Sequence, residues 1–439
     1  MESEPGYRSV TLALLNKEKI HVGDVVELVM ESTKARGTVV PRYQSSDDLH
    51  LVIKLRSGYN VGFNVRKIRN IVKVASGEKP AFTAAPPPKG RDELPLVSIL
   101  GTGGTIASRV DYRTGAVHPA ISSGELYSLI PELSEIARIE PEILLSLSSE
   151  NLEPDHWSTI AEKVARVVKR GVRGVVITMG TDTMGYTAAA LTFALEGIPL
   201  PVFIVASQRS SDRPSSDAYL NLIGAVSCAV SAEFSGVFVV MHNDTSDDKL
   251  AIHTGTRVRK NHTSARDAFE SIGLEPVALW SRSGLQVTST NLKKRATSSS
   301  FRPRTKFDKN AALVKFYPSM PPTIIRSLTD SGVKGIVLEG TGLGHVNRSN
   351  MEVITEAVKK KVIVCMTSQC IWGRVDMNVY DNGRDLLKAG VIPLDDSLGE
   401  SSLVKLMWAL ANSGSIEEAK RMMRSNIAGE ITDRSLPEA

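Results

Sequence analysis

From residue 94 onward, short apolar runs alternate with stretches of helical periodicity, and this alternation restricts the possible folds more than any other feature. The stretches predicted as helices are residues 157–169 and 183–196. The runs predicted as strands are residues 96–100, 174–178, 201–206, 236–240, 335–338 and 362–365. Strands that alternate with helices build parallel sheets covered by helices on both faces. The chain is therefore predicted to be an α/β protein.

The first 75 residues follow a different pattern. Short runs rich in β-branched and aromatic residues lie close together there, and Ser57-Gly58 fits a hairpin turn between two of them. We predict a small all-β barrel domain over residues 1–75. Residues 76–93 are rich in proline and are expected to form an extended, semi-rigid linker.

Beyond the linker, changes in composition suggest three further parts. A large α/β domain is predicted over residues 94–288, and it would carry the candidate catalytic residues. Residues 289–312 are polar and basic, and we interpret them as a connector. A smaller C-terminal α/β domain with a C-terminal tail is predicted over residues 313–439.

The overall composition is typical of a cytoplasmic globular protein without a membrane segment. The 439 residues are 42% hydrophobic and carry a net charge of only +5. No segment approaches the roughly 20 apolar residues that span a bilayer. The acidic first residues lack the pattern of a signal peptide. The three cysteines are too few for a disulfide framework, and we expect Cys365 and Cys370 to be ordinary buried thiols.

A glycine-rich octapeptide, GTGGTIAS at residues 101–108, directly follows the first predicted strand of the large domain. In parallel α/β sheets, ligands bind beyond the carboxyl ends of the strands. A dinucleotide fingerprint would need glycine where Ile106 stands, and no Gly-Lys-Ser/Thr sequence closes a phosphate-binding loop. Two interpretations remain, namely a plain tight turn or a ligand site that offers the Thr105 hydroxyl.

Two further segments combine hydroxyl and charged groups. The sequence GTDTM at residues 180–184 again follows a predicted strand and precedes a predicted helix. Its threonine and aspartate side chains could cap that helix or could serve chemistry. Lys260 lies in the polar stretch of residues 257–269, where a lysine is either solvated or part of a site.

Together the three segments resemble the asparaginase/glutaminase family, whose motifs read TGGTIA, HGTDTM and K-x-x-T-S/T-x-x-x-x-F. The resemblance covers residues 94 to about 425 and implies an asparaginase-like two-domain architecture with no metal. It assigns Thr105 and Thr181 as the catalytic threonines, with Asp182 and Lys260 beside them. It also implies that Ser149 and Glu150 hold the α-amino and carboxylate groups of the substrate.

The sequence departs from the family pattern at three positions. Tyr112 is the candidate for a tyrosine that activates the first threonine, but it lies nearer to Thr105 than is usual, and a surface-loop position is the alternative. Glu150 replaces the glutamine of the secreted asparaginases, which could shift substrate selectivity. Met179 replaces the histidine of the second motif, and we expect little effect because Thr181 and Asp182 follow it intact.

The implied roles agree with elementary chemistry. A threonine hydroxyl is a weak nucleophile and needs a base. Lys260 could take a proton from Thr181 while Asp182 orients the amine. Thr105 would attack a side-chain amide to give an acyl-enzyme and ammonia, and backbone N–H groups of the glycine turn could stabilise the oxyanion. Which threonine attacks first stays open at this stage.

The long N-terminal extension and residues 207–218 and 366–375 resemble the ammonia-supplying subunits of archaeal tRNA-dependent amidotransferases. This resemblance implies a homodimer that hydrolyses glutamine or asparagine. Ammonia would pass to a partner subunit, which uses ATP and Mg to convert Glu-tRNA(Gln) to Gln-tRNA(Gln), so no cofactor is expected in this chain. The alternatives are a free-standing asparaginase/glutaminase with an extra domain and a degenerate amidase fold kept for binding.

Two regions have open roles. The barrel could bind RNA, dock a partner or serve as a scaffold. Residues 282–309 contain one acidic residue, Asp308, and eight basic residues that could contact tRNA phosphates or form a solvated connector. The eight are Arg282, Lys293, Lys294, Arg295, Arg302, Arg304, Lys306 and Lys309. Because the implied division of labour places tRNA mainly on the partner, we favour the connector.

Overall fold

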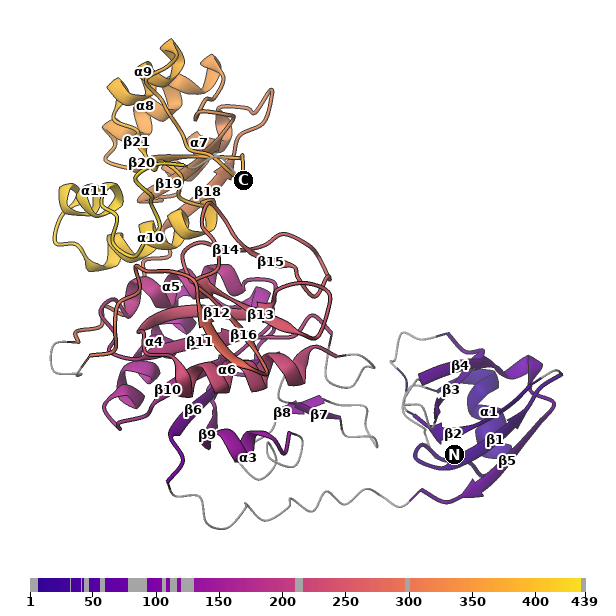
Figure 1. Ribbon diagram of the computed structural model, residues 1–439. Helices are drawn as coiled ribbons and strands as arrows, with labels where there is room; N and C mark the ends of the chain where they lie inside the picture. Colours follow the sequence, from indigo (N-terminus) through magenta and orange to yellow (C-terminus); the bar gives the residue numbers. More distant parts are fainter. Residues whose placement is uncertain are drawn as a thin grey trace.

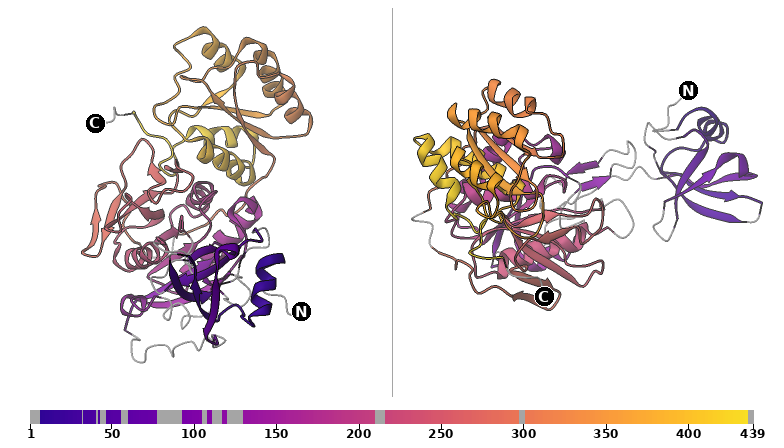
Figure 2. Two further views of the ribbon diagram at one scale, coloured as in Figure 1. Left: turned by 90° about the vertical axis from the view of Figure 1, so that its right-hand side faces the viewer. Right: turned by 90° about the horizontal axis from the view of Figure 1, so that it is seen from above.

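A computed structural model describes most of the chain as three units (Figure 1). The described residues are 7–31, 33–40, 42, 47–55, 60–77, 93–104, 108–110, 117–119, 130–209, 216–296 and 301–435. Two α/β units lie against each other, and the small N-terminal unit stands apart from them in Figure 1 and in the right-hand view of Figure 2.

The N-terminal unit is an antiparallel five-stranded sheet in the order β4-β3-β2-β1-β5. Its strands are β1 (Val25–Val29), β2 (Lys34–Val39), β3 (His50–Leu55), β4 (Asn60–Asn64) and β5 (Asn70–Ala75). Alternate residues such as Val26 and Leu28 face its core, as expected for a sheet with one buried face. The small β unit is thus confirmed, and β3 and β4 form a hairpin whose predicted turn, Ser57-Gly58, lies outside the described residues.

The helical elements of this unit were not predicted from the sequence. Helix α1 (Ser9–Lys17) precedes the sheet and buries Leu15 in its core, and a short 3-10 helix, η1 (Val65–Lys67), follows β4. The helical stretch was overlooked because its apolar residues do not follow a clear helical period, and only Thr11 and Leu15 are fully buried.

The large unit is built on an eight-stranded sheet in the order β17-β16-β13-β12-β11-β10-β6-β9. The five strands that run parallel are β6 (Leu96–Gly101), β9 (Arg138–Ile143), β10 (Gly174–Thr178), β11 (Pro201–Val205) and β12 (Gly236–His242). Three antiparallel strands extend it, β13 (Lys249–Thr254), β16 (Ala278–Ser281) and β17 (Gly284–Val287). The parallel core is confirmed, and the sheet as a whole is mixed.

Helices cover both faces of this sheet (Figure 1). They are α3 (Leu133–Ile136), α4 (Pro154–Val168), α5 (Met184–Ala194) and α6 (Ala218–Ser231). Helices α3 and α6 share one core with Val176 of β10, whereas α4 and α5 share the other with Val175 and Ile177. Because β10 is covered on both sides, all five of its residues are buried and its sequence is continuously apolar up to Thr178.

The C-terminal unit is a smaller parallel sheet in the order β18-β19-β20-β21 with helices on both sides. Its strands are β18 (Ala311–Lys315), β19 (Gly335–Gly340), β20 (Ile363–Ser368) and β21 (Ile392–Pro393). Its helices are α7 (Thr323–Asp330), α8 (Met351–Lys359), α9 (Asp381–Ala389), α10 (Gly399–Asn412) and α11 (Ile416–Arg424). Trp408 of α10 stacks on Phe193 of α5 at 5.7 Å between ring centroids, which joins the two α/β units through a shared core.

A buried arginine also joins the two units. The Arg257 side chain is 1% exposed, and its Nε donates to the carbonyl of Ile272 at 2.9 Å. Its Nη1 donates to the carbonyls of Asp396 (2.8 Å) and Glu430 (3.0 Å), and Nη2 donates to Asp396 Oδ2 at 3.0 Å. Because these acceptors come from three separate parts of the chain, Arg257 fixes the large unit, the smaller unit and the tail relative to one another.

Several basic side chains of the predicted connector contact other parts of this chain. Arg295 donates to three backbone carbonyls of the large unit, at 2.5–3.0 Å. Arg304 lies 4.2 Å from the centroid of the Trp408 ring, and Lys306 donates to Glu162 at 3.2 Å. These contacts favour the interpretation of the segment as a connector, and contact of the remaining basic side chains with tRNA phosphates stays the open alternative.

One cysteine prediction was wrong. Cys228 and Cys365 are buried, but Cys370 is exposed, because it lies two residues past the end of β20 and outside the core. Within the described ranges, no helix is long and apolar enough to cross a membrane.

A buried ion pair in the C-terminal unit provides a stability prediction. Lys405 and Glu430 are 2.5 Å apart with side chains 1% and 0% exposed, so Lys405→Met would leave a buried carboxylate without its partner. We expect the free energy of unfolding, measured by urea denaturation, to fall by about 3–5 kcal/mol. The exposed pair Lys420–Glu417 is the control, and Lys420→Met should cost at most about 1 kcal/mol. Equal losses in the two variants would contradict this assignment.

Candidate active site

Two of the three sequence motifs begin where neighbouring parallel strands end. Strand β6 ends at Gly101 and β10 at Thr178, and these two residues are partners in the register of the pair. The backbone N–H and the hydroxyl of Thr102 both donate to the carbonyl of Thr178, at 2.9 and 3.0 Å. The glycine turn and the GTDTM segment therefore leave the same edge of the sheet side by side.

The glycine turn packs tightly against the segments that carry the other candidate residues. Gly103 and Gly104 have φ angles of +132° and +75°, which L side chains rarely adopt. A Cβ on Gly103 would overlap the carbonyl oxygen of Leu147, and one on Gly104 would lie 2.6 Å from that of Met179. The turn thus needs glycine both for its backbone conformation and for its approach to two other loops.

Thr105 and Tyr112 lie outside the described residues, so their predicted roles are not tested by the structure. The structure does describe Gly104, the residue before Thr105, against the backbone of Met179 and Gly180. The chain consequently enters the Thr105 segment from a point next to the second threonine motif.

Lys260 reaches the second motif from a separate hairpin. Strand β14 (Val258–Lys260) pairs with β15 (Phe269–Ser271), with Lys260 opposite Phe269. Phe269 and Val258 are buried in the same core as Met184 of α5, which places the hairpin over the start of that helix. The lysine that looked solvated in the sequence is 14% exposed at its side chain.

The Lys260 amine contacts both candidate partners in the second motif. Its Nζ lies 2.9 Å from Thr181 Oγ1 and 2.7 Å from Asp182 Oδ1. As an ammonium it donates to both oxygens, and as a free amine it would accept the threonine proton over the same distance. The Asp182 side chain is 69% exposed, so water reaches the carboxylate while the lysine stays largely covered.

Ser149 and Glu150 lie in a 3-10 helix, η2 (Ser149–Asn151), beside the second motif. Ser149 is buried, its carbonyl accepts the Thr183 hydroxyl at 2.6 Å, and a Cβ on Gly180 would come within 2.9 Å of its Oγ. Glu150 is exposed. The Thr183 side chain makes no cap hydrogen bond to α5, so its hydroxyl joins two site segments and does not cap the helix.

A charged cluster on the other side of β14 was not predicted from the sequence. Arg259, next to Lys260, pairs with Glu400 of α10 at 3.4 Å. Burial and the nearby Glu400 charge raise the pKa of Glu339, and burial with the same two carboxylates raises the pKa of Tyr186 to about 12. No local sequence signal points to this cluster, because its members are far apart along the chain and meet only where the two α/β units pack.

Within the described part of the chain, no group of three or more histidine, cysteine, aspartate or glutamate side chains could hold a metal ion. The groups that the site brings together are a hydroxyl, an amine and a carboxylate. With a mixed sheet of this topology, they fit an amidohydrolase of the asparaginase type.

Comparisons with known proteins agree with this class and narrow it. The family descriptions "Asparaginase, N-terminal" and "Glutaminase/Asparaginase C-terminal domain" match residues 96–293 and 310–423, and "GatD N-terminal domain" matches residues 20–74. The chain is 48% identical over 430 residues to the D subunit of glutamyl-tRNA(Gln) amidotransferase from Pyrococcus furiosus, covering 96% of this chain and 98% of that one. The chain belongs to the family of glutamyl-tRNA(Gln) amidotransferase D subunits.

Other relatives and solved structures are consistent with this family. The D subunit from Metallosphaera sedula is 45% identical, with 98% of this chain and 97% of that one covered. The thermostable L-asparaginase from Thermococcus kodakarensis has a TM-score of 0.68 at 35% identity, covering 77% of this chain and 99% of that one. L-asparaginase I from Vibrio cholerae gives a TM-score of 0.67 at 29% identity with the same coverage.

The close packing of the glycine turn yields a prediction with a matched control. Gly104→Ala should lower kcat/KM for amide hydrolysis about 100-fold, because the new Cβ pushes the turn away from Met179. Gly171 has nearly the same φ, +76°, but open space around it, so Gly171→Ala should cost about 1 kcal/mol of stability and leave kcat/KM unchanged. Similar kcat/KM values for the two variants would refute the packing argument.

Proposed function

We propose that this chain is the ammonia-generating subunit of an ATP-dependent glutamyl-tRNA(Gln) amidotransferase of archaeal type. It hydrolyses the side-chain amide of glutamine or asparagine for a carbon–nitrogen ligase in which glutamine is the amido donor. The observation that carries the proposal is the contact of Lys260 with both Thr181 and Asp182. The relatives named as amidotransferase D subunits, which match nearly the whole chain, support the assignment to a tRNA-dependent complex.

The proposed reaction is acyl transfer through a threonine. The Thr105 hydroxyl adds to the amide carbon, and backbone N–H groups of the glycine turn stabilise the oxyanion. The proton of the Thr105 hydroxyl passes to the amide nitrogen, which leaves as ammonia, and the acyl group stays on Thr105 as an ester. Lys260 takes the proton of Thr181, and Thr181 in turn assists attack by water on that ester, which releases glutamate or aspartate.

Ser149 and Glu150 are proposed to hold the amino-acid end of the substrate. Ser149 presents its hydroxyl and backbone next to Gly180, and the exposed Glu150 offers a carboxylate to the α-amino group. A carboxylate attracts an ammonium more strongly than a neutral amide does. We therefore expect the amino-acid end of the substrate to bind even though residue 150 is glutamate where the secreted asparaginases have glutamine.

The partner in this proposal is the E subunit of the amidotransferase, which would use ATP and Mg to phosphorylate Glu-tRNA(Gln) and trap the ammonia. This chain needs no cofactor of its own, and two copies would associate through their asparaginase-like units. Free ammonia is protonated in bulk water and loses its nucleophilicity, so a sealed route to the partner is physically favourable. Glu-tRNA(Gln) would bind mainly to the partner.

A free-standing asparaginase/glutaminase is the second candidate. The solved L-asparaginases match 77% of this chain, and residues 20–74 of the N-terminal unit match the family description "GatD N-terminal domain". A free-standing enzyme has no evident use for that unit, which makes this candidate the weaker one. Purification of the native protein separates the two proposals, because a stoichiometric second protein is expected only for the amidotransferase.

The catalytic lysine can be tested against a structurally similar one. Lys260→Ala should lower the rate of ammonia release from glutamine by at least about 100-fold, because it removes the proposed base. Lys163 is also largely buried and pairs with Glu142 at 2.5 Å, so Lys163→Ala should retain the wild-type rate. Thr105→Val should match Lys260→Ala. Both inactive variants should still assemble with the partner, and persisting ammonia release would exclude the mechanism.

Dependence on the partner gives a second test. Glutaminase activity of the isolated chain should be at least about tenfold below that of the complex with the partner and Glu-tRNA(Gln), since ammonia is useful only when it can be trapped. Formation of glutamate from glutamine, or of aspartate from asparagine, is measured with and without partner, ATP and Glu-tRNA(Gln). If the isolated chain is as fast as the complete complex, the division of labour is wrong.

A further inference from the structure

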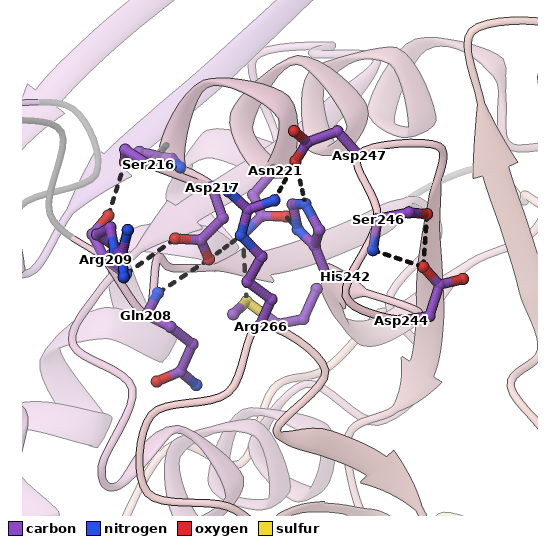
Figure 3. A network of polar contacts seen from close by, with 12 residues as sticks. Gln208, Arg209, Ser216, Asp217, Asn221, His242, Asp244, Ser246, Asp247 and Arg266 are labelled. Atoms are coloured by element: carbon purple, nitrogen blue, oxygen red, sulfur yellow. Dashed lines mark hydrogen bonds and ion pairs between the residues drawn. The ribbon is translucent and has the colours of Figure 1, made fainter. Parts of the chain in front are cut away.

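A continuous set of polar contacts runs along the edge of the large sheet where β11 and β12 end (Figure 3). Asp217, fully buried just before α6, accepts the backbone N–H groups of Gln208 and Arg209 at 2.9 Å each. Asn221, one turn along α6, donates its amide to Asp217 at 3.1 Å and to the carbonyl of Ala206 at 2.9 Å. These contacts fix the start of the segment that follows β11.

The contacts continue through a buried histidine. Because the Asn221 amide nitrogen is already directed to two acceptors, its Oδ1 faces His242, and His242 Nδ1 donates to it at 2.7 Å. The other ring nitrogen lies 3.1 Å from Asp247 Oδ1, and Arg266 Nη1 lies 2.5 Å from the same oxygen. His242 is fully buried at the end of β12, so it links α6 to the Asp247–Arg266 pair.

Arg266 belongs to the hairpin that carries the proposed catalytic lysine. It lies in the connection of residues 261–268, between the end of β14 at Lys260 and the start of β15. His262 Nδ1 accepts two backbone N–H groups within this connection, and Asn261 N donates to the carbonyl of Ala268 at 2.6 Å. The connection is therefore internally braced, so a displacement at Arg266 moves the strand end at Lys260.

The solvent exposure of the Asp247 and Arg266 side chains indicates that their ion pair positions Lys260 and contributes little to folding stability. Asp247 is 65% exposed at its side chain and Arg266 is 21% exposed. Ion pairs with one solvent-exposed partner contribute little to folding stability. A displacement of about 1 Å at a catalytic group, by contrast, lowers rates by up to about 100-fold. Loss of this pair should consequently affect catalysis far more than folding.

We infer that Arg266, Asp247 and His242 are positioning residues for Lys260, which tie its hairpin to α6 and to the segment that follows β11. The inference rests on the proposed amidase function and deepens it, because it identifies what holds the base against Thr181. None of the three residues needs to contact substrate. Their effect passes through the backbone of the hairpin, and it should appear in the rate of the chemical step with little change in substrate binding.

The test uses the complete complex with the partner and measures the formation of glutamate from glutamine. Arg266→Ala should lower kcat by about tenfold or more with KM within about twofold of wild type, and the melting temperature should not change. Arg266→Lys keeps a cation opposite Asp247 and should restore most of kcat. Arg170→Ala is the matched control, because Arg170 pairs with Glu140 at the same 2.5 Å but lies on an exposed part of the large unit.

The outcomes distinguish this inference from the proposed function. Wild-type kcat in Arg266→Ala overturns the positioning role, as does a kcat loss that coincides with a lower melting temperature. A rise in KM at constant kcat also overturns it, since that result would place Arg266 in substrate binding. If the wild-type complex forms no glutamate from glutamine, the proposed function itself fails, whatever the variants do.

Discussion

The buried guanidinium of Arg257 is the interaction on which the arrangement of the two α/β units depends. Removing a charge from water is costly unless its donors are satisfied, and here burial lowers the pKa of Arg257 while the Asp396 carboxylate opposes that shift. Its donors meet acceptors from the large unit, the smaller unit and the C-terminal tail. Because Arg257 lies three residues before Lys260, the same short stretch that closes the interface between the units also presents the amine to Thr181.

The site itself follows from the topology of a parallel sheet. Neighbouring strands β6 and β10 end together, so the turns after them leave the same edge, and the lack of a side chain at Gly104 allows those turns to touch. The lack of a side chain at Gly180 leaves room for Ser149. A hairpin from elsewhere in the chain then covers the edge with Lys260. The result is an amine that is mostly covered, beside a carboxylate that stays open to water. This asymmetry suits the proposed exchange of a proton between the Lys260 amine and the Thr181 hydroxyl.

Much of this could be predicted from the sequence. The strand at residues 174–178 was predicted with its observed bounds, since a strand covered on both faces has a continuous apolar sequence. The proximity of Lys260, Thr181 and Asp182 was expected only because three motifs together resembled one family; Lys260 alone looked solvated. Helix α1, the exposure of Cys370, the Arg257 contacts and the Asp247–Arg266 pair were not predicted. Each depends on contacts between residues distant in sequence, or on packing that produces no regular spacing of apolar residues along the chain.

In the proposed function, the site makes ammonia for a partner and does not release it to solvent. The most direct measurement uses the complete complex, glutamine carrying nitrogen-15 at its side-chain amide, and an excess of unlabelled ammonium in the buffer. Mass spectrometry of the glutaminyl group on the product tRNA then reports the origin of its amide nitrogen. We expect the nitrogen-15 label to be transferred to the product tRNA with little dilution by the unlabelled ammonium. A product that carries mainly unlabelled nitrogen would contradict it.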